Sequence, residues 1–194
     1  MIIGDTRDYL FDIILPKNCI CAEIGVYRGV NSDRIINLSN PKELYLIDIW
    51  SIFGNYKKHL SDEKAYIILN ETRNNYKYIK DKYKDNKNIK IIKEDSVKTS
   101  KQFEDNYFDW VYIDAAHDYE SVKKDIDNWW PKVKKNGYLC GHDYELKNPG
   151  IIEVKRAVDE FIKSNNLELY YKGIGDDKTN KSAWDGPSDW AIKK

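Results

Sequence analysis

The stretch FDWVYIDAAHDYESVKKDIDNWWPKVKKNGYLCGHDY, residues 108–144, decides the fold of this chain. It opens with the apolar run FDWVYIDA (108–115) and closes with a second one, GYLCGHD (137–143). Short runs of this kind, closed by Gly or an acid, are typical of strands buried on both faces. Residues 119–133 place apolar side chains three and four positions apart, which predicts a helix. Strand, helix and strand in succession predict two parallel strands joined by a crossover helix.

The same alternation continues on both sides of this unit. Three more strands are expected at CICAEIG (19–25), ELYLIDIW (43–50) and NIKIIKED (88–95). Helical periodicity is present at residues 32–38, 63–83 and 151–164. We therefore expect an α/β fold of the doubly wound, Rossmann-like type, with a mainly parallel sheet and helices on both faces.

The end of the chain predicts an exception to the parallel order. Two strand candidates, LELYYKG (167–173) and DWAIKK (189–194), are joined by a polar loop with no room for a crossover helix. This arrangement predicts a hairpin, so the last of seven strands should be antiparallel. With 194 residues, the chain is expected to form a single domain over residues 1–194.

Composition narrows the function classes. Hydrophobic residues make up 41% and charged residues 33%, and 32 basic residues balance 32 acidic ones. Zero net charge favours neither nucleic acid nor an anionic membrane as a partner. No apolar run reaches the roughly 20 residues of a membrane helix. The three cysteines, Cys19, Cys21 and Cys140, lie inside strand candidates, which indicates buried thiols and, with no export signal, a cytoplasmic protein.

Ligands of a doubly wound sheet lie beyond the carboxyl ends of its strands, near the point where strand order reverses. The first strand ends in EIGVYRG, where Gly25 allows a tight turn and Gly29 lets the next helix approach. A dinucleotide fingerprint would need GxGxxG, but Val26 and Tyr27 occupy that stretch. Glu23 also stands where a pyrophosphate would lie, so the motif argues against NAD.

Three successive strands end in an acid. Glu23 suits a cationic ligand with an amino group and a sulfonium, and Asp48 offers two oxygens to the hydroxyls of a ribose. Asp95, followed by Ser96, is placed to hold an adenine amino group. Any one of these acids would be as well explained as a helix cap or turn residue. All three together favour a nucleoside site.

The motifs EIGVYRG, LIDIW and EDS, followed by residues 108–144, resemble class I S-adenosylmethionine-dependent methyltransferases. The resemblance is to the small-molecule and sugar O-methyltransferase branch, of the macrocin type, and runs from about Glu23 to the terminal SDWAIKK. It implies the strand order 3-2-1-4-5-7-6 and S-adenosylmethionine as methyl donor. The expected cofactor-binding residues are Glu23, Gly25, Gly29, Asp48, Asp95, Ser96 and Asp114.

Four polar residues close the fourth and fifth strands and should face the methyl group: Asp114, His117, His142 and Asp143. Methyl transfer needs alignment of donor and acceptor, and removal of a proton when the acceptor is a hydroxyl. His117 and His142 are both candidate bases, with Asp143 beside them. Alternatively, His117 caps the following helix and His142 packs under a loop.

The resemblance also implies a metal site. In the related sugar O-methyltransferases, an Asp after the fourth strand and an acidic pair after the fifth bind a divalent ion such as Mg²⁺. Asp114 and Asp143 match, whereas His142 replaces one acid of the pair and Ala116 stands where many members have Asp. The expected ligands are Asp114, His142 and Asp143, although an imidazole weakens the preference for Mg²⁺.

The expected activity is O-methylation of a hydroxyl on a sugar, glycan or other small molecule. Ring-bearing residues of two loops, and one just beyond the second, are expected to line the acceptor pocket or to pack as a lid. The first loop carries Trp50, Phe53, Tyr56 and His59, and the second carries Trp184, with Trp190 just beyond it. A nucleic-acid methyltransferase is disfavoured because the chain has neither an NPPY-like motif nor a basic extension. A non-catalytic cofactor-binding scaffold stays open because of Ala116. A homodimer is compatible with such a domain.

Overall fold

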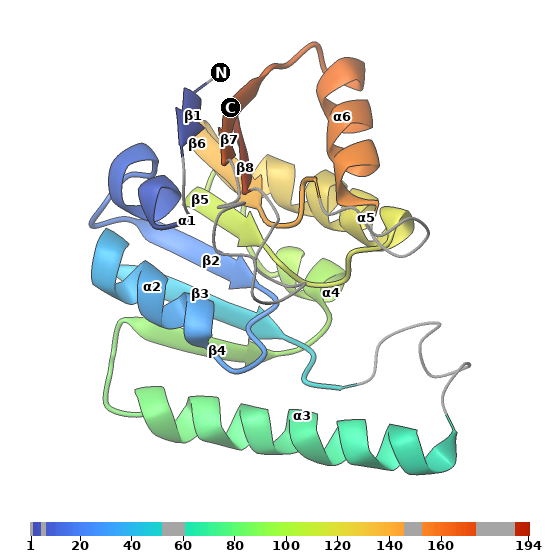
Figure 1. Cartoon of the computed structure of the whole chain (residues 1–194). Helices are drawn as coiled ribbons and strands as arrows, with labels where there is room; N and C mark the ends of the chain where they lie inside the picture. Colours follow the sequence, from blue (N-terminus) through green and yellow to red (C-terminus); the bar gives the residue numbers. More distant parts are fainter. Residues whose placement is uncertain (1, 5–6, 52–60, 146–152, 174–188) are drawn as a thin grey trace.

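The computed structural model describes residues 2–4, 7–51, 61–145, 153–173 and 189–194. Their strands form one eight-stranded sheet in the order β1-β7-β8-β6-β5-β2-β3-β4 (Figure 1). The strands are β1 (Ile2–Gly4), β2 (Ile20–Ile24), β3 (Glu43–Asp48), β4 (Ile89–Lys93), β5 (Phe108–Ile113), β6 (Val133–Gly141), β7 (Leu169–Gly173) and β8 (Trp190–Lys193).

The predicted topology is confirmed. Counted from β2, the strands follow the order 3-2-1-4-5-7-6, and β8 is antiparallel to both β6 and β7. The structure adds one strand that the sequence did not reveal, because β1 has only three residues and shows no period. It pairs in parallel with β7 and extends the sheet at that edge.

Helices cover both faces of the sheet (Figure 1). They are α1 (Arg7–Tyr9), α2 (Val30–Ser39), α3 (Asp62–Tyr83), α4 (Ser96–Ser100), α5 (Tyr119–Trp129) and α6 (Val154–Ser164), with a π-helical turn at Leu10–Ile14. One core cluster joins the π-helical turn, α2 and α3 to residues such as Trp110 and Tyr112 of β5. The other core cluster joins α5 and α6 to Val111 and Ile113, the residues that alternate with Trp110 and Tyr112 along β5. Strand residues thus alternate between two cores, as expected for a sheet buried on both faces.

Two boundaries differ by four residues from the predicted ones, and the others in the described part of the chain differ by less. The helix expected over residues 119–133 ends at Trp129 and continues as a 3₁₀ turn, Trp130–Lys132, because Pro131 has no N–H for the helical ladder. Strand β6 begins at Val133, not at Gly137, although its first half is partly exposed and polar. The short helices α1 and α4 had no periodic signal long enough to predict them.

Cysteine burial is confirmed, since Cys19, Cys21 and Cys140 are buried free thiols. Among the described residues, no helix is both long enough and apolar enough to cross a membrane.

The turn after β2 fixes the relation between two strands. Gly25 adopts φ +90°, and a Cβ at this position would lie 2.1 Å from the backbone oxygen of Asp114. Gly29, at φ +71°, is the N-cap of α2, and a Cβ there would lie 2.5 Å from the Cδ1 atom of Ile79 in α3. The predicted roles of both glycines, a tight turn and a close helix approach, agree with these contacts.

We expect the Gly25→Ala substitution to lower the free energy of unfolding by about 3 kcal/mol, because it adds a backbone clash to an unfavourable φ. Gly173→Ala is the matched control: its Cβ would lie 3.2 Å from the nearest atom, the backbone nitrogen of Asp189, and should cost less than about 1 kcal/mol. Urea denaturation followed by circular dichroism measures both. Equal losses in the two variants would contradict this account of the turn.

Candidate functional site

The predicted polar residues gather at one edge of the sheet. Strands β4, β3, β2, β5 and β6 are parallel neighbours, so their carboxyl ends lie side by side. Glu23 and Asp48 belong to the ends of β2 and β3, and Asp95 follows β4. Asp114 follows β5, and His142 follows β6. The acids are therefore not scattered over separate surfaces.

Glu23 is fully buried under the first turn of α2. Its two carboxyl oxygens accept hydrogen bonds from Asn31 Nδ2 at 3.0 Å and Ser32 Oγ at 2.5 Å. Burial raises the pKa of Glu23 to about 8, against the lowering effect of these two hydrogen bonds. Near neutral pH the carboxyl group is therefore largely protonated. Both carboxyl oxygens of Glu23 are thus occupied by hydrogen bonds from α2.

Asp48 organises the turn after β2. Its Oδ2 atom accepts hydrogen bonds from the backbone N–H groups of Val26 and Tyr27, both at 2.9 Å. Its Oδ1 atom accepts from the backbone N–H of Trp50 at 2.6 Å. One carboxylate thus links the ends of β2 and β3, at the place where a ribose was expected.

Asp95 and Ser96 have structural partners. Asp95 is the N-cap of α4, and its Oδ1 accepts a hydrogen bond from the backbone N–H of Lys98 at 3.0 Å. Ser96 Oγ donates to Asp125 Oδ1 at 2.5 Å and accepts from Trp129 Nε1 at 2.8 Å. Burial raises the pKa of Asp125 to about 7. Asp95 is therefore a helix cap, which is the structural role that the sequence also allowed for a single acid after a strand.

Asp114, His117 and Asp143 form a compact cluster between the ends of β5 and β6. His117 Nε2 lies 3.4 Å from Asp114 Oδ1 and 3.1 Å from Asp143 Oδ2. One potential ligand atom from each residue lies within 4.8 Å of the others. The helix cap is Asp118, whose side chain accepts from the backbone N–H of Ser121, so His117 does not cap α5.

The cluster shifts the pKa values of its members. Burial acts to lower the pKa of His117, but the hydrogen bond to Asp114 and the charge of Asp143 outweigh it, so this pKa is raised. Burial acts to raise the pKa of Asp114, but the hydrogen bond from His117 and nearby positive charge leave it lowered. Burial raises the pKa of Asp143, which adopts φ +60°. His117 therefore favours the imidazolium form between two acids.

His142 faces a different acid, which the sequence analysis missed. Its Nδ1 lies 3.0 Å from Asp189 Oδ1, and its Nε2 lies 3.4 Å from Asp143 Oδ1. Tyr112 also donates a hydrogen bond to Asp189 Oδ1, at 2.6 Å. The compact cluster differs from the expected metal ligand set: Asp114 and Asp143 group with His117, while the Nδ1 of His142 is turned towards Asp189.

A second missed residue, Arg7, comes from the N-terminal segment. Its guanidinium lies 3.4 Å from Asp189, 3.7 Å from Asp114 and 3.2 Å from Asn31 Oδ1. Burial acts to lower the pKa of Arg7, but the surrounding acids raise it. In the sequence, Arg7 is a lone arginine among acids and apolar residues, and such an arginine does not by itself indicate a function.

Of the aromatic residues expected at the acceptor pocket, the two that the structure describes, Trp50 and Trp190, are buried in the protein core. Trp50 is 3% exposed, and its ring centroid lies 5.0 Å from that of Tyr76. Trp190 is fully buried, and its Nε1 donates to the backbone oxygen of His142. Phe53, Tyr56, His59 and Trp184 lie outside the described residues.

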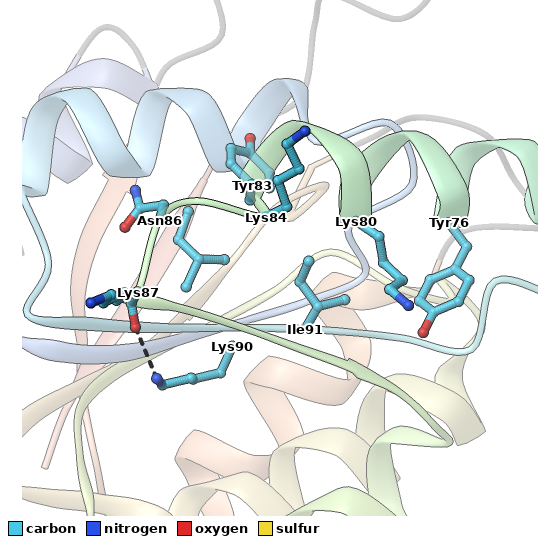
Figure 2. Close-up of a pocket in the computed structure, with 9 residues that line it drawn as sticks. Tyr76, Lys80, Tyr83, Lys84, Asn86, Lys87, Lys90 and Ile91 are labelled. Atoms are coloured by element: carbon cyan, nitrogen blue, oxygen red, sulfur yellow. Dashed lines mark hydrogen bonds between the residues drawn. The ribbon is translucent and has the colours of Figure 1, made fainter.

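A basic groove of about 560 Å³ lies between the carboxyl-terminal half of α3 and the edge strand β4 (Figure 2). It is lined by Tyr76, Lys80, Tyr83, Lys84, Asn86, Lys87, Ile89, Lys90 and Ile91. Its lysines form no ion pair with a described residue, and Lys90 Nζ donates to the backbone oxygen of Lys87 at 2.8 Å. Lysines on an edge strand keep it from pairing with another sheet. The groove lies apart from the histidine cluster.

Comparison with known proteins assigns the chain to a family. A family model described as "Methyltransferase domain" matches residues 22–144, more than half of the chain and all strands from β2 to β6 except the first two residues of β2. A curated relative, the uncharacterized protein y4gI of Sinorhizobium fredii, is 36% identical over 47 residues. That segment is 24% of this chain and 5% of y4gI, so the chain spans only a small part of that protein.

Solved structures share the fold at low sequence identity. A SAM-dependent methyltransferase from Aquifex aeolicus has a TM-score of 0.61 at 13% identity, with 97% of this chain and 94% of that chain covered. The N-methyltransferase NodS from Bradyrhizobium japonicum has a TM-score of 0.60 at 14% identity, covering 92% and 87%. An rRNA methylase from Streptococcus thermophilus has a TM-score of 0.55 at 12% identity, covering 96% and 93%.

The raised pKa of Glu23 predicts how stability depends on pH. A carboxyl group whose pKa rises from 4.5 to about 8 on folding binds more protons in the folded state, so stability falls as pH rises through this window. Glu23→Gln mimics the protonated form and removes this contribution. We expect the variant to match the wild type near pH 5 and to melt several degrees higher near pH 9.

Thermal melts at both pH values measure this effect, with Glu104→Gln as the matched exposed control. An identical pH dependence in wild type and Glu23→Gln would show that Glu23 is ionised in the folded protein and would contradict the prediction.

Proposed function

The chain belongs to the methyltransferase domain family, and we propose that it transfers a methyl group from S-adenosylmethionine to a hydroxyl oxygen of a small molecule. The observation that carries the proposal is the group of two imidazoles and three acids at the ends of β5, β6 and the start of β8. These residues are Asp114, His117, His142, Asp143 and Asp189.

The donor half of the proposal rests on the turn after β2. S-adenosylmethionine supplies a methyl group on a positively charged sulfur. Gly25 lets the turn pack directly against the backbone of Asp114, and Asp48 fixes the turn through two backbone N–H groups. Asp48 is the residue we assign to the ribose, while Asp114 supplies negative potential towards the cation and Glu23 holds the first turn of α2 through Asn31 and Ser32. Gly29, Asp95 and Ser96 shape the cofactor end through their packing and hydrogen bonds.

The acceptor half rests on His142. In the reaction, the acceptor oxygen forms a bond to the methyl carbon as the bond from that carbon to sulfur breaks, which leaves a neutral thioether. The hydroxyl proton must pass to a base. Because Asp189 accepts from Nδ1 of His142, it favours the tautomer whose Nε2 carries the lone pair that takes this proton. His117 is less suited, since its raised pKa favours a form that is already protonated.

Asp114, His117 and Asp143 also fit a divalent cation. Two carboxylates and one imidazole with ligand atoms within 4.8 Å of one another are a donor set for a metal such as Mn²⁺ or Fe²⁺, and a weaker one for Mg²⁺. A bound ion would supply positive charge beside the acceptor oxygen. Its binding would compete with protonation of His117, because a histidine ligand must be neutral.

The site, and not the fold, supports the choice of acceptor class, because the fold serves many acceptors. A hydroxyl needs a base, and His142 provides one, which favours a sugar, glycan or other small alcohol over an acceptor that carries no proton to remove. The Streptococcus thermophilus structure is an rRNA methylase, so RNA is the second acceptor to test. A protein that binds the donor without turnover is the third outcome.

We expect the protein to bind S-adenosylhomocysteine in calorimetry and to methylate members of a panel of glycosides and phenols, with RNA as a parallel arm. Asp48→Ala should weaken the affinity for S-adenosylhomocysteine by about tenfold or more, because it loses the residue assigned to the ribose. His142→Ala should lower kcat by about 100-fold or more and leave that affinity within about twofold.

Asp105→Ala is the matched control. This acid is exposed and, among the described residues, forms an ion pair with Lys132 alone, so its loss should change neither quantity. Methylation of RNA alone would replace the small-molecule acceptor. Loss of affinity in His142→Ala without loss of kcat would mean that the donor and acceptor ends have been exchanged.

The metal proposal has its own test. We expect EDTA to lower turnover and Mn²⁺ or Mg²⁺ to restore it, and Asp143→Asn to weaken Mn²⁺ binding in calorimetry, because one of three ligands changes from a carboxylate to an amide. Unchanged turnover in chelator, together with no heat of Mn²⁺ binding, would remove the metal from the mechanism.

A further inference from the structure

We propose that Arg7 binds the carboxylate of the amino-acid end of the methyl donor, and so selects a donor that carries this group. The inference rests on the proposed use of S-adenosylmethionine. It assigns a ligand to a residue from the N-terminal segment, which lies before the part of the chain that the methyltransferase family model covers.

Arg7 reaches the site from outside the strand ends. It is the first residue of α1, yet its side chain is only 17% exposed. Its guanidinium contacts Asp114 after β5, Asp189 before β8 and Asn31 in the first turn of α2. It also lies 5.7 Å from the ring centroid of Tyr112. These contacts place one positive charge between the turn after β2 and the histidine cluster.

Most hydrogen-bonding capacity of Arg7 is still available. A guanidinium carries five N–H donors, and those of Arg7 make one hydrogen bond to a described residue, from Nη1 to Asn31 Oδ1 at 3.2 Å. The contacts with Asp189 and Asp114, at 3.4 and 3.7 Å, are longer than hydrogen bonds between charged groups. Arg7 can therefore receive another carboxylate in the paired geometry that a guanidinium favours.

The ligand matches the charges around Arg7. The donor ends in an ammonium and a carboxylate, so its site needs acceptors and one cation side by side. Asn31 joins these two kinds of group, because its Oδ1 accepts from Arg7 while its Nδ2 donates to Glu23. Arg28 also lies near the turn after β2, but its Nη2 donates a hydrogen bond to Glu71 of α3 at 2.8 Å.

The test compares S-adenosylhomocysteine with its decarboxylated analogue, which differs only by the missing carboxylate. Calorimetry should show that the wild type binds S-adenosylhomocysteine at least tenfold more tightly than the analogue. In Arg7→Met this preference should disappear, because the partner of the carboxylate is gone, while the analogue binds as well as before. Arg7→Lys should recover part of the preference.

The outcomes separate this inference from the proposed function. If the wild type binds neither ligand, the proposed donor is wrong. If the wild type binds both and Arg7→Met keeps the full preference for S-adenosylhomocysteine, the donor stands and the role of Arg7 is overturned. Equal loss of both ligands in Arg7→Met and in Arg7→Lys would also overturn it, since a carboxylate partner cannot affect a ligand without a carboxylate.

Discussion

The backbone of Gly25 lies against the backbone of Asp114, and the site depends on this contact. No side chain fits between them, because a Cβ on Gly25 would lie 2.1 Å from the Asp114 oxygen. The turn that follows β2 is thereby held against the end of β5, and Asp48 holds the same turn to the end of β3. The donor turn and the residue that begins the histidine cluster are therefore one rigid unit. Such preorganisation fixes donor and acceptor relative to each other before reaction.

Concentrating acids at one edge requires compensation, and the structure provides three kinds. Glu23 is neutralised by a proton, as its pKa of about 8 indicates. Asp114 and Asp143 share the imidazole of His117. Asp189 receives Arg7, His142 and the hydroxyl of Tyr112. Because buried charge is costly without a partner, these residues stabilise the site only as a set.

The sequence predicted the sheet well because its strands are buried on both faces and leave continuous apolar runs. It also placed the acids correctly, since an acid after a parallel strand must lie at the carboxyl edge. The role of Arg7 could not be predicted from the sequence, because α1 has only three residues and no pattern reveals the direction of its side chain. The exchange of His142 for His117 in the acidic cluster was equally hidden. Both imidazoles follow neighbouring strands, and only their side-chain conformations decide which acid each one meets.

Asp189 is different, because the sequence contained enough to find it. The hairpin predicted over residues 167–194 makes the last strand antiparallel, as β8 is. An antiparallel strand begins at the edge where its parallel neighbours end, so the residue before β8 must lie beside the residues after β6. Asp189 meets His142 for this reason, and Trp190 follows it into the core, with its Nε1 bound to the His142 backbone. The reversed strand thus closes the sheet and brings an acid to the candidate base through the same short segment.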